Sequence, residues 1–356
     1  MLLLIDNNTK IDYLSEALNH IALEDLTEFI EASVDLLEEE DIIMLRSLFM
    51  EANNKGRYLM SNINDPLAEK NIARLLSQVS TAQRTVEWYK QGQTVLTASQ
   101  FATILKGPRT RGQLVMEKAL TVTDLQKKTN CVRTEDIRAF DWGIRFEPIV
   151  KQLYENITSS TVTDLGRLIH QTDKNLAASP DGLVTEGERR GRLVEFKAPI
   201  TRPIKADDVP EDYWIQMQIQ MEVADLMLCD YFEVKFSSPY GLKEWTKPGE
   251  EEKNYGKGKI FLIGDKEDAQ PQYYFYPKFG TNEEPTLKDD EVILESIPWV
   301  STGYNLKTID RSTHWFKSMT EPISKFWKDV EEAKKGAFIL PESSRKRKPE
   351  ACLIVD

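Results

Sequence analysis

The chain has 356 residues, which at about 150 residues per domain is room for two domains or for one domain with large additions. Apolar residues make up 40% and charged residues 29%, as in soluble globular proteins, which excludes collagen-like and largely disordered chains. No apolar run approaches the ~20 residues of a membrane helix. The opening stretch 1–5 is too short and too poor in basic residues for a signal peptide. We therefore expect an intracellular protein that is neither secreted nor membrane-bound.

The net charge of −12 is unevenly distributed. Residues 1–80 hold 15 acidic and 6 basic side chains, a net charge of −9 that leaves only −3 for the rest of the chain. Phosphate binding needs Lys and Arg, so a globally acidic protein is a poor candidate for binding nucleic acid. The nearly neutral remainder weakens that objection. Three cysteines far apart, without a CxxC pair, argue against a disulfide scaffold and a zinc ribbon.

Hydrophobic periodicity predicts helices in the first part of the chain. Apolar residues recur mostly at three- and four-residue spacing over 11–80, which predicts an acidic, all-helical N-terminal domain over 1–84 for packing or partner contact. Thr97-Ala98-Ser99 is a capping sequence for a helix that we expect to run through Leu105 and to break at Gly107-Pro108.

From residue 141 onward, helical and β-type stretches alternate. Helices are predicted at 141–155, 211–228 and 313–334, and strands at 161–170, 182–185, 192–196, 231–236, 259–263, 272–276 and 292–294. Strands flanked by helices on both sides predict a mixed α/β core. The tail 341–356 contains Arg345-Lys346-Arg347-Lys348 and is expected to be disordered; this run could be a nuclear-localisation signal, a DNA-binding patch or a plain solvated segment.

Four short motifs stand out in chain order. They are Gly143-x-x-x-Glu147, Ser179-Pro180-Asp181-Gly182, Glu195-Phe196-Lys197 and Tyr213-x-x-Gln216-x-Gln218. Each is weak alone, since Glu-x-Lys also occurs at Glu233–Lys235, Glu251–Lys253 and Glu332–Lys334, and Pro-Asp-Gly is a common turn. Their combination is more informative than any one of them.

A strand–turn–strand hairpin would bring the acids of two motifs together. Asp181 would lie at the start of one strand, and Glu195 and Lys197 on one face of the next, because alternate strand residues share a face. Two carboxylates beside an ammonium suit a hard cation, and Mg²⁺ favours carboxylate oxygens and bridges to phosphate.

In this order, the four motifs resemble the PD-(D/E)xK nucleases, specifically phage lambda exonuclease and the YqaJ-type viral recombinase nucleases, which include alkaline exonucleases of phages and large DNA viruses. The likeness covers about 85–240 and 300–335. Further matching segments are Trp88-Tyr89-Lys90, Val95–Ser99, Lys106–Gly112, Ile309-Asp310-Arg311 and Trp315-Phe316. The resemblance implies a restriction-endonuclease-like core, a mixed central sheet flanked by helices, in a nuclease domain over 85–340 with an insertion at about 245–300.

The resemblance also implies roles for individual residues. Asp181 and Glu195 would be the principal ligands of Mg²⁺, or of Mn²⁺ in its place, with the backbone carbonyl of Phe196 as a third ligand. Glu147 would support a second metal. Lys197 would be the catalytic lysine.

Gln216 would orient the active-site water or Lys197, unless it is an ordinary polar residue on an amphipathic helix. Ser99, Ser179 and Arg109 would grip a 5′-phosphate, with Arg111 as a second candidate. One position departs from the family pattern: Gly92 stands where the family has an arginine. If that arginine anchors the 5′-phosphate, this chain has lost it or replaced it with Lys90, Arg109 or Arg111.

The implied activity is that of a metal-dependent exonuclease on duplex DNA, acting 5′→3′ in viral or phage recombination, repair or genome processing. A structure-specific or endonucleolytic nuclease is one alternative, and a non-catalytic DNA-end or partner-binding module is another. The expected partners are double-stranded DNA ends, a single-strand annealing protein and two further copies in a homotrimer. A viral protein of this kind would work in the host cytoplasm or nucleus.

Overall fold

The computed structural model describes residues 66–78, 86–120, 139–206, 208–239 and 254–342. Most of the predicted N-terminal domain and nearly all of the predicted basic tail lie outside the described residues, so their boundaries stay predictions. No helix in the described ranges is long and apolar enough to cross a membrane.

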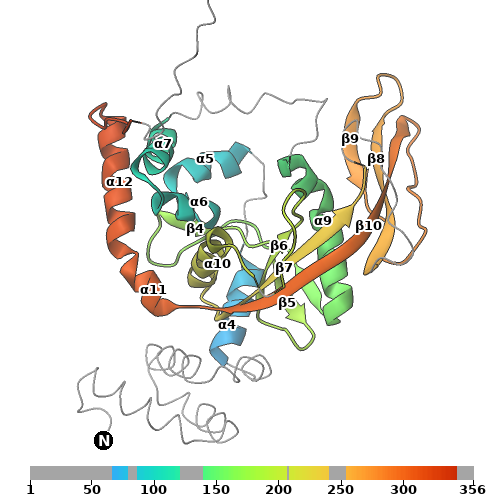
Figure 1. Ribbon diagram of the computed structural model, residues 1–356, viewed down its shortest axis with the longest axis horizontal. Helices are drawn as coiled ribbons and strands as arrows, with labels where there is room; N and C mark the ends of the chain where they lie inside the picture. The colour runs from blue at the N-terminus through green and yellow to red at the C-terminus, as the bar shows by residue number, and fades with distance from the viewer. Residues whose placement is uncertain (1–65, 79–85, 121–138, 207, 240–253, 343–356) are drawn as a thin grey trace, which may run out of the picture.

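A seven-stranded mixed sheet forms the centre of the fold (Figure 1). Its spatial order is β2 (Thr161–Thr163), β5 (Gly182–Glu186), β6 (Leu193–Lys197), β7 (Leu228–Ser237), β10 (Glu291–Asp310), β8 (Gly256–Asp265) and β9 (Pro271–Phe275). Only β6 and β7 pair in parallel, and the other neighbours are antiparallel. A parallel pair needs a crossover connection, and here the helix α10 (Glu211–Ala224) provides it.

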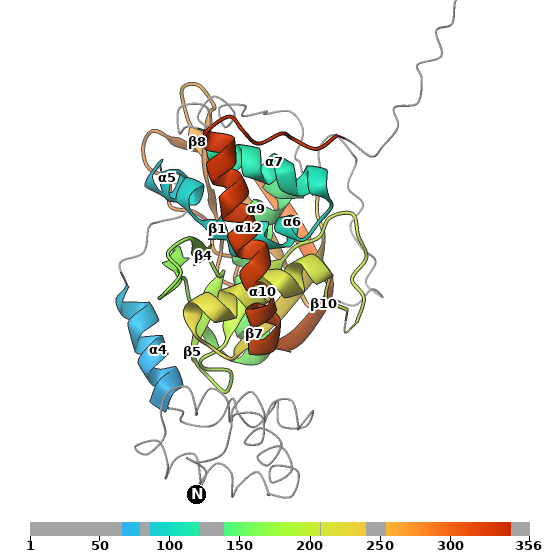
Figure 2. The ribbon, with the colours of Figure 1, turned by 90° about the vertical axis from the view of Figure 1, so that its left-hand side faces the viewer.

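Helices cover both faces of this sheet. On one face, α9 (Ala139–Thr158) packs apolar side chains against β6 and β7. On the other face, α10 packs against α6 (Ala98–Ile104), and α12 (Thr320–Lys334) against α7 (Pro108–Ala119), as Figure 2 shows from the α12 side. Consecutive residues of β6 enter different cores, Leu193 the α10 side and Val194 the α9 side. The predicted mixed α/β core flanked by helices is confirmed.

A second, smaller sheet lies on the α10 side. It consists of β1 (Leu96–Thr97), β4 (Leu176–Ala178) and β3 (Leu168–Ile169), and β4 contacts α10. The predicted strand over 161–170 is therefore two short strands in two different sheets. Between them, Asp164 binds Lys151 of α9 through a 2.6 Å ion pair.

The predicted helix break at Gly107-Pro108 is confirmed, because α6 ends at Ile104 and a new helix, α7, begins after Gly107. Pro108 is the first residue of α7, where its missing N–H is not needed by the helix and its fixed φ suits the first turn. The segment 106–112 therefore contains a short turn and the first residues of α7. Two further helices, α5 (Val86–Thr94) and α11 (Thr313–Ser318), complete this half of the molecule, and α11 is separated from α12 only at Met319.

The strand β10 is much longer than predicted. It has 20 residues, of which the sequence indicated only 292–294. It pairs with β8 along its first half and with β7 along its second half, with register shifts at Ile293/Glu295 and Ser301/Gly303. In Figure 1 it runs from α11 to the arm formed with β8 and β9. The bulges and Pro298 interrupt the period of two by which a strand is recognised.

The helix α4 (Pro66–Ser77) joins the core. Its Ile72 and Leu75 are each 2% exposed and belong to the core on the α10 side. Asn71 donates 2.8 and 2.9 Å bonds to the carbonyl and carboxylate of Asp225, the left-handed residue that ends α10. The last part of the predicted N-terminal domain therefore packs against the nuclease-like core at the end of α10.

Candidate active site

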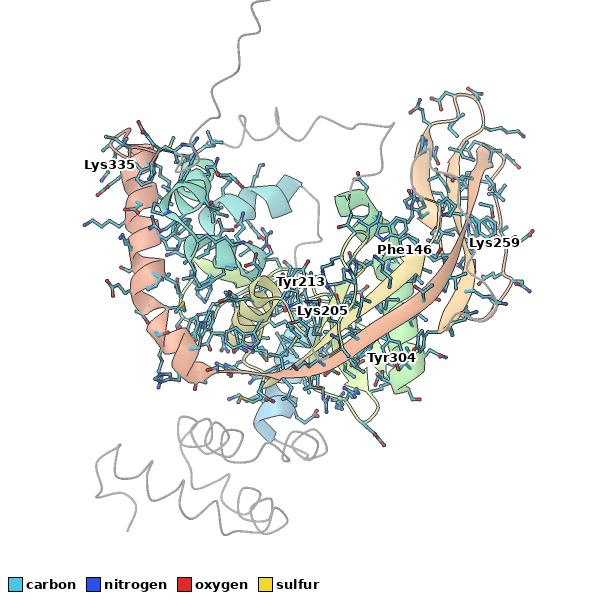
Figure 3. The ribbon with its side chains drawn as sticks, in the orientation of Figure 1. Phe146, Lys205, Tyr213, Lys259, Tyr304 and Lys335 are labelled. Carbon is cyan, nitrogen blue, oxygen red and sulfur yellow. The ribbon has the colours of Figure 1, made fainter. Side chains whose placement is uncertain are left out.

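All four motifs meet at an open pocket of about 440 Å³. Glu147 on α9, Asp181 directly before β5, Lys197 at the end of β6 and Tyr213 in the first turn of α10 all line it. Gly143, one helical turn before Glu147, lines it too, and a Cβ there would meet nothing within 4 Å. Figure 3 shows Tyr213 near the middle of the molecule, where the helical half meets the sheet.

Asp181 is half-buried, and its carboxyl group lies near two other acids, Glu195 and Glu147. The backbone N–H of Phe196 donates a 2.7 Å bond to its Oδ2. Burial raises the pKa of this carboxyl well above its usual range, and the charges of Glu195 and Glu147 raise it further, against the opposing effect of Lys197. A proton or a cation at Asp181 is therefore favoured.

Glu195 is fully buried and held on both oxygens. Its Oε1 accepts hydrogen bonds from Lys197 and, at 2.8 Å, from Gln216. Its Oε2 accepts a 2.6 Å bond from Gln220. The predicted Gln216 thus contacts the predicted metal ligand Glu195. A second glutamine, Gln220, which was not predicted from the sequence, contacts its other oxygen.

The spacing of the glutamines on α10 explains this geometry. Gln216 and Gln220 are four residues apart and share a helix face. Gln218, the other glutamine of the motif, instead donates 2.7 Å to the carbonyl of Asp310 and accepts 2.6 Å from the N–H of Ser312. It joins α10 to the turn between β10 and α11. The i, i+4 pair was the signal that could have identified Gln220.

Lys197 is a charged group fixed between an acid and a ring. Its ammonium pairs with Glu195 and lies 4.7 Å from the ring centroid of Tyr213. Burial alone would lower its pKa, but Glu195 and Asp181 raise the pKa by more, so the net shift is upward. Lys197 therefore stays protonated and can stabilise negative charge, but it is a poor proton acceptor.

The candidate ligand atoms of this site are all oxygens, the type that a hard cation prefers. Within the described ranges, no three His, Cys, Asp or Glu side chains converge closely enough to form a complete ligand set on their own. Asp181 and Glu195, with the carbonyl of Phe196, offer oxygen ligands only, and Mg²⁺ commonly keeps several waters beside one or two carboxylates. Burial and the charges of Glu195 and Glu147 raise the pKa of Asp181, and a cation would relieve the repulsion between these acids. The residues present thus fit Mg²⁺.

The four predicted phosphate-binding residues lie outside this pocket lining. Ser99 is exposed at the start of α6, and Ser179 is half-buried two residues before Asp181. Arg109 is exposed and donates 2.9 Å to the carbonyl of Pro341. Arg111 forms a 2.5 Å ion pair with Asp329 that joins α7 to α12, so its guanidinium is already paired.

A different arginine lies beside Gly92. A Cβ at Gly92 would be 3.4 Å from Nη1 of Arg167, a residue that is 6% exposed. The ammonium of Lys118 donates to the carbonyls of Gly92 and Val95, the latter at 2.7 Å. The cationic groups around this position are thus Lys118 and Arg167, neither of which the sequence analysis considered.

Residues 87–227 match the YqaJ-like viral recombinase domain. This match agrees with the resemblance that the four motifs indicated, and the matched segment contains Glu147, Asp181, Glu195, Lys197 and Gln216. An uncharacterized protein of Acanthamoeba polyphaga mimivirus is 26% identical over 233 residues, which are 57% of this chain and 41% of that protein. The chain thus matches less than half the length of this relative.

The solved structures similar to this chain include two exonucleases. The alkaline exonuclease LHK-Exo from Laribacter hongkongensis is 20% identical with a TM-score of 0.43, over 71% of this chain and 95% of that one. Its complex with dAMP has the same coverage and identity and a TM-score of 0.41. A phage-related exonuclease from Haemophilus somnus is 15% identical with a TM-score of 0.36, over 68% of this chain and 92% of that one.

Proposed function

We propose that this protein is a metal-dependent DNA exonuclease that hydrolyses phosphodiester bonds of duplex DNA from the 5′ end, in viral or phage recombination, repair or genome processing. The observation that carries the proposal is the meeting of Asp181 and Lys197 in one open pocket, with Glu195 buried against Lys197, inside the segment that matches the recombinase family.

The metal in this proposal is Mg²⁺, with Mn²⁺ able to substitute. Asp181, Glu195 and the carbonyl of Phe196 would hold it, and Glu147 would support a second ion. Such an ion lowers the pKa of water and offsets charge on a phosphate. The raised pKa of Asp181 supports this assignment, because burial and the charges of Glu195 and Glu147 disfavour the carboxylate, and a bound cation would stabilise it.

Side chains of α10 would orient the metal ligand Glu195 and the ammonium of Lys197. Gln216 and Gln220 fix the carboxylate of Glu195 from its two sides. Tyr213 holds the ammonium of Lys197 over its ring, so that its positive charge faces the pocket where a phosphate would gain charge.

For the 5′-phosphate, Ser99, Ser179 and Arg109 remain the proposed contacts. Arg111 is a weaker candidate, because binding a phosphate would require it to leave Asp329. We add Arg167 as a proposed replacement for the family arginine whose position Gly92 occupies. Nη1 of Arg167 would be 3.4 Å from a Cβ at Gly92, so its guanidinium lies next to that position. Double-stranded DNA ends, an annealing protein and a homotrimeric assembly are proposed partners on the same family basis.

Digestion of a linear duplex labelled at one end tests the proposal. The comparison includes 5′-phosphate and 5′-hydroxyl ends, Mg²⁺ and EDTA, and a covalently closed circle. The exonuclease should release nucleotides from the 5′ end only with Mg²⁺ and leave the circle intact. Cutting of the circle would instead favour the endonuclease, and DNA binding without cutting in any metal would favour the non-catalytic module.

A further inference from the structure

The loop after β6 forms one wall of the candidate active site. Residues 198–202 follow Lys197 directly and line the pocket. Lys235 on the neighbouring strand β7 fixes this loop, since its ammonium donates to the carbonyls of Pro199, Ile200 and Arg202 at 3.2, 2.5 and 3.2 Å. The wall is therefore tied to the central sheet.

The side chain of Arg202 is anchored to the same strand. Its Nη2 donates to the carboxylate of Glu233 and, at 3.0 Å, to the hydroxyl of Tyr231, which itself donates 2.9 Å to Glu233. The guanidinium carbon lies 5.8 Å from the ring centroid of Tyr213, the ring that also carries Lys197. Glu233 is the strand partner of Lys197 in the parallel β6–β7 pair.

The Glu233–Lys235 tripeptide thus has a structural purpose. In the sequence it is one of several Glu-x-Lys repeats without evident meaning. In the fold it lies one strand away from Glu195–Lys197, and both of its charged ends hold the loop that carries Arg202.

This anchoring leaves part of the guanidinium available. Both hydrogen bonds of Arg202 use Nη2, so Nε and Nη1 have no hydrogen-bond partner among the described residues. The side chain is 33% exposed. Among the described residues that line the pocket, Arg202 is the only arginine, and the other cation, Lys197, is paired with Glu195.

A phosphate entering this pocket would meet the acids Glu147 and Asp181 and needs positive charge near them. A guanidinium presents several N–H donors in a rigid fork that matches phosphate oxygens. A guanidinium that is anchored through one nitrogen, with its other nitrogens free to donate, is already oriented before the phosphate binds. This lowers the entropy cost of binding.

We propose that Arg202 is a phosphate-binding residue of this pocket. Its Nε and Nη1 donate to non-bridging oxygens of a phosphodiester near the cleaved end, while Glu233 and Tyr231 hold the guanidinium in place. Arg202 thereby selects a nucleic-acid backbone and positions it against the acids. The proposal rests on the proposed nuclease function.

The first test is the salt dependence of duplex binding in EDTA, where no cleavage interferes. Each phosphate contact contributes about 0.9 to the slope of log affinity against log salt. Arg202→Gln should therefore lower the slope by about 0.9, and Arg202→Lys should keep most of the slope but bind more weakly, because the ammonium lacks the fork. Arg190→Gln is the matched control: Arg190 is also paired with a glutamate, Glu69, and is 40% exposed, but lies outside the pocket lining.

The second test separates a lost contact from a disturbed fold. Neutral methylphosphonates are placed one at a time in the terminal linkages of the duplex. One linkage should weaken binding of the wild-type protein and of Arg190→Gln but have no effect on Arg202→Gln, because the two changes remove the same contact. Equal sensitivity of wild type and Arg202→Gln at every linkage, or an unchanged salt slope, would overturn the proposal. Wild-type protein that does not bind duplex DNA at all would overturn the proposed function as well.

Discussion

Gln220 donates a 2.6 Å hydrogen bond to Oε2 of Glu195, on the opposite side of this carboxylate from the bonds to Oε1. Both residues are 0% exposed, so water does not replace this bond when it is removed. The orientation of the candidate metal ligand therefore depends on a side chain that lies one helical turn beyond Gln216 and outside the recognisable motif.

Gln220→Met should consequently weaken metal binding and activity. We expect about 10- to 100-fold, as for other groups that orient ligands, and about 1–3 kcal/mol of stability for the unsatisfied carboxylate oxygen. The Mg²⁺ concentration at half-maximal activity is the readout. Gln218→Met is the control, because Gln218 faces Asp310 and Ser312 and should lose stability with the Mg²⁺ midpoint unchanged. Equal midpoints in all three proteins would exclude this role.

Asp181 should make the folded state less stable as pH rises. Its carboxyl pKa is raised on folding, so above the unfolded value the folded protein retains the proton longer than the unfolded one. Stability from this group is present at low pH and falls until the raised pKa is passed. Asp181→Asn should remove this fall and raise the melting temperature near neutral pH. A variant with the same pH profile as wild type would contradict the burial and repulsion described for this group.

Divalent metal should act on the same group. Mg²⁺ or Mn²⁺ that binds only the folded state stabilises it by mass action. We expect millimolar Mg²⁺ to raise the melting temperature of the wild type, and EDTA to reverse the increase. Asp181→Asn should show little or no shift. A shift of the same size in both proteins would place the bound metal elsewhere.

Tyr213 should matter through its ring and not through its hydroxyl. The ammonium of Lys197 lies 4.7 Å from the ring centroid, and such a contact contributes about 0.5–2 kcal/mol. Tyr213→Phe should therefore retain nearly full activity, whereas Tyr213→Leu should lose about 2- to 30-fold in kcat. Equal activities of the Phe and Leu variants would show that the ring does not position Lys197.

Lys118 should make the free energy of unfolding increase with pH in the alkaline range. Burial lowers its pKa to about 8. Between about pH 8 and its ordinary value of 10.5 the unfolded chain binds the proton and the folded protein has released it, so stability from this group rises with pH. Relative to Lys118→Met, the free energy of unfolding of the wild type should increase by about 3 kcal/mol over this range. Parallel pH curves for the two proteins would contradict it.

The sequence could predict the acid and lysine constellation because its causes are local. A Pro-Asp-Gly turn before one strand and the alternation of Glu195 and Lys197 along the next are enough to place these groups together. Gln216 followed from the motif, and the structure brings it to Glu195.

The rest depends on contacts between distant segments. Gln220, Arg202 and Lys235 were missed because their purpose appears only when α10 and β7 are packed beside β6. The ion pair of Arg111, a candidate for the 5′-phosphate, was missed because its partner Asp329 lies on the distant helix α12. β10 was underestimated because its bulges disturb the alternation that identifies a strand.

We propose that the buried acid Glu195 and its neighbours hold a metal for strand cleavage. Mg²⁺-dependent release of nucleotides from an end-labelled duplex by the wild type and by Glu195→Gln tests this role, with duplex binding measured in parallel. We predict release by the wild type, loss of several orders of magnitude in the variant and binding within a few-fold of wild type. Undiminished release by Glu195→Gln would contradict this role.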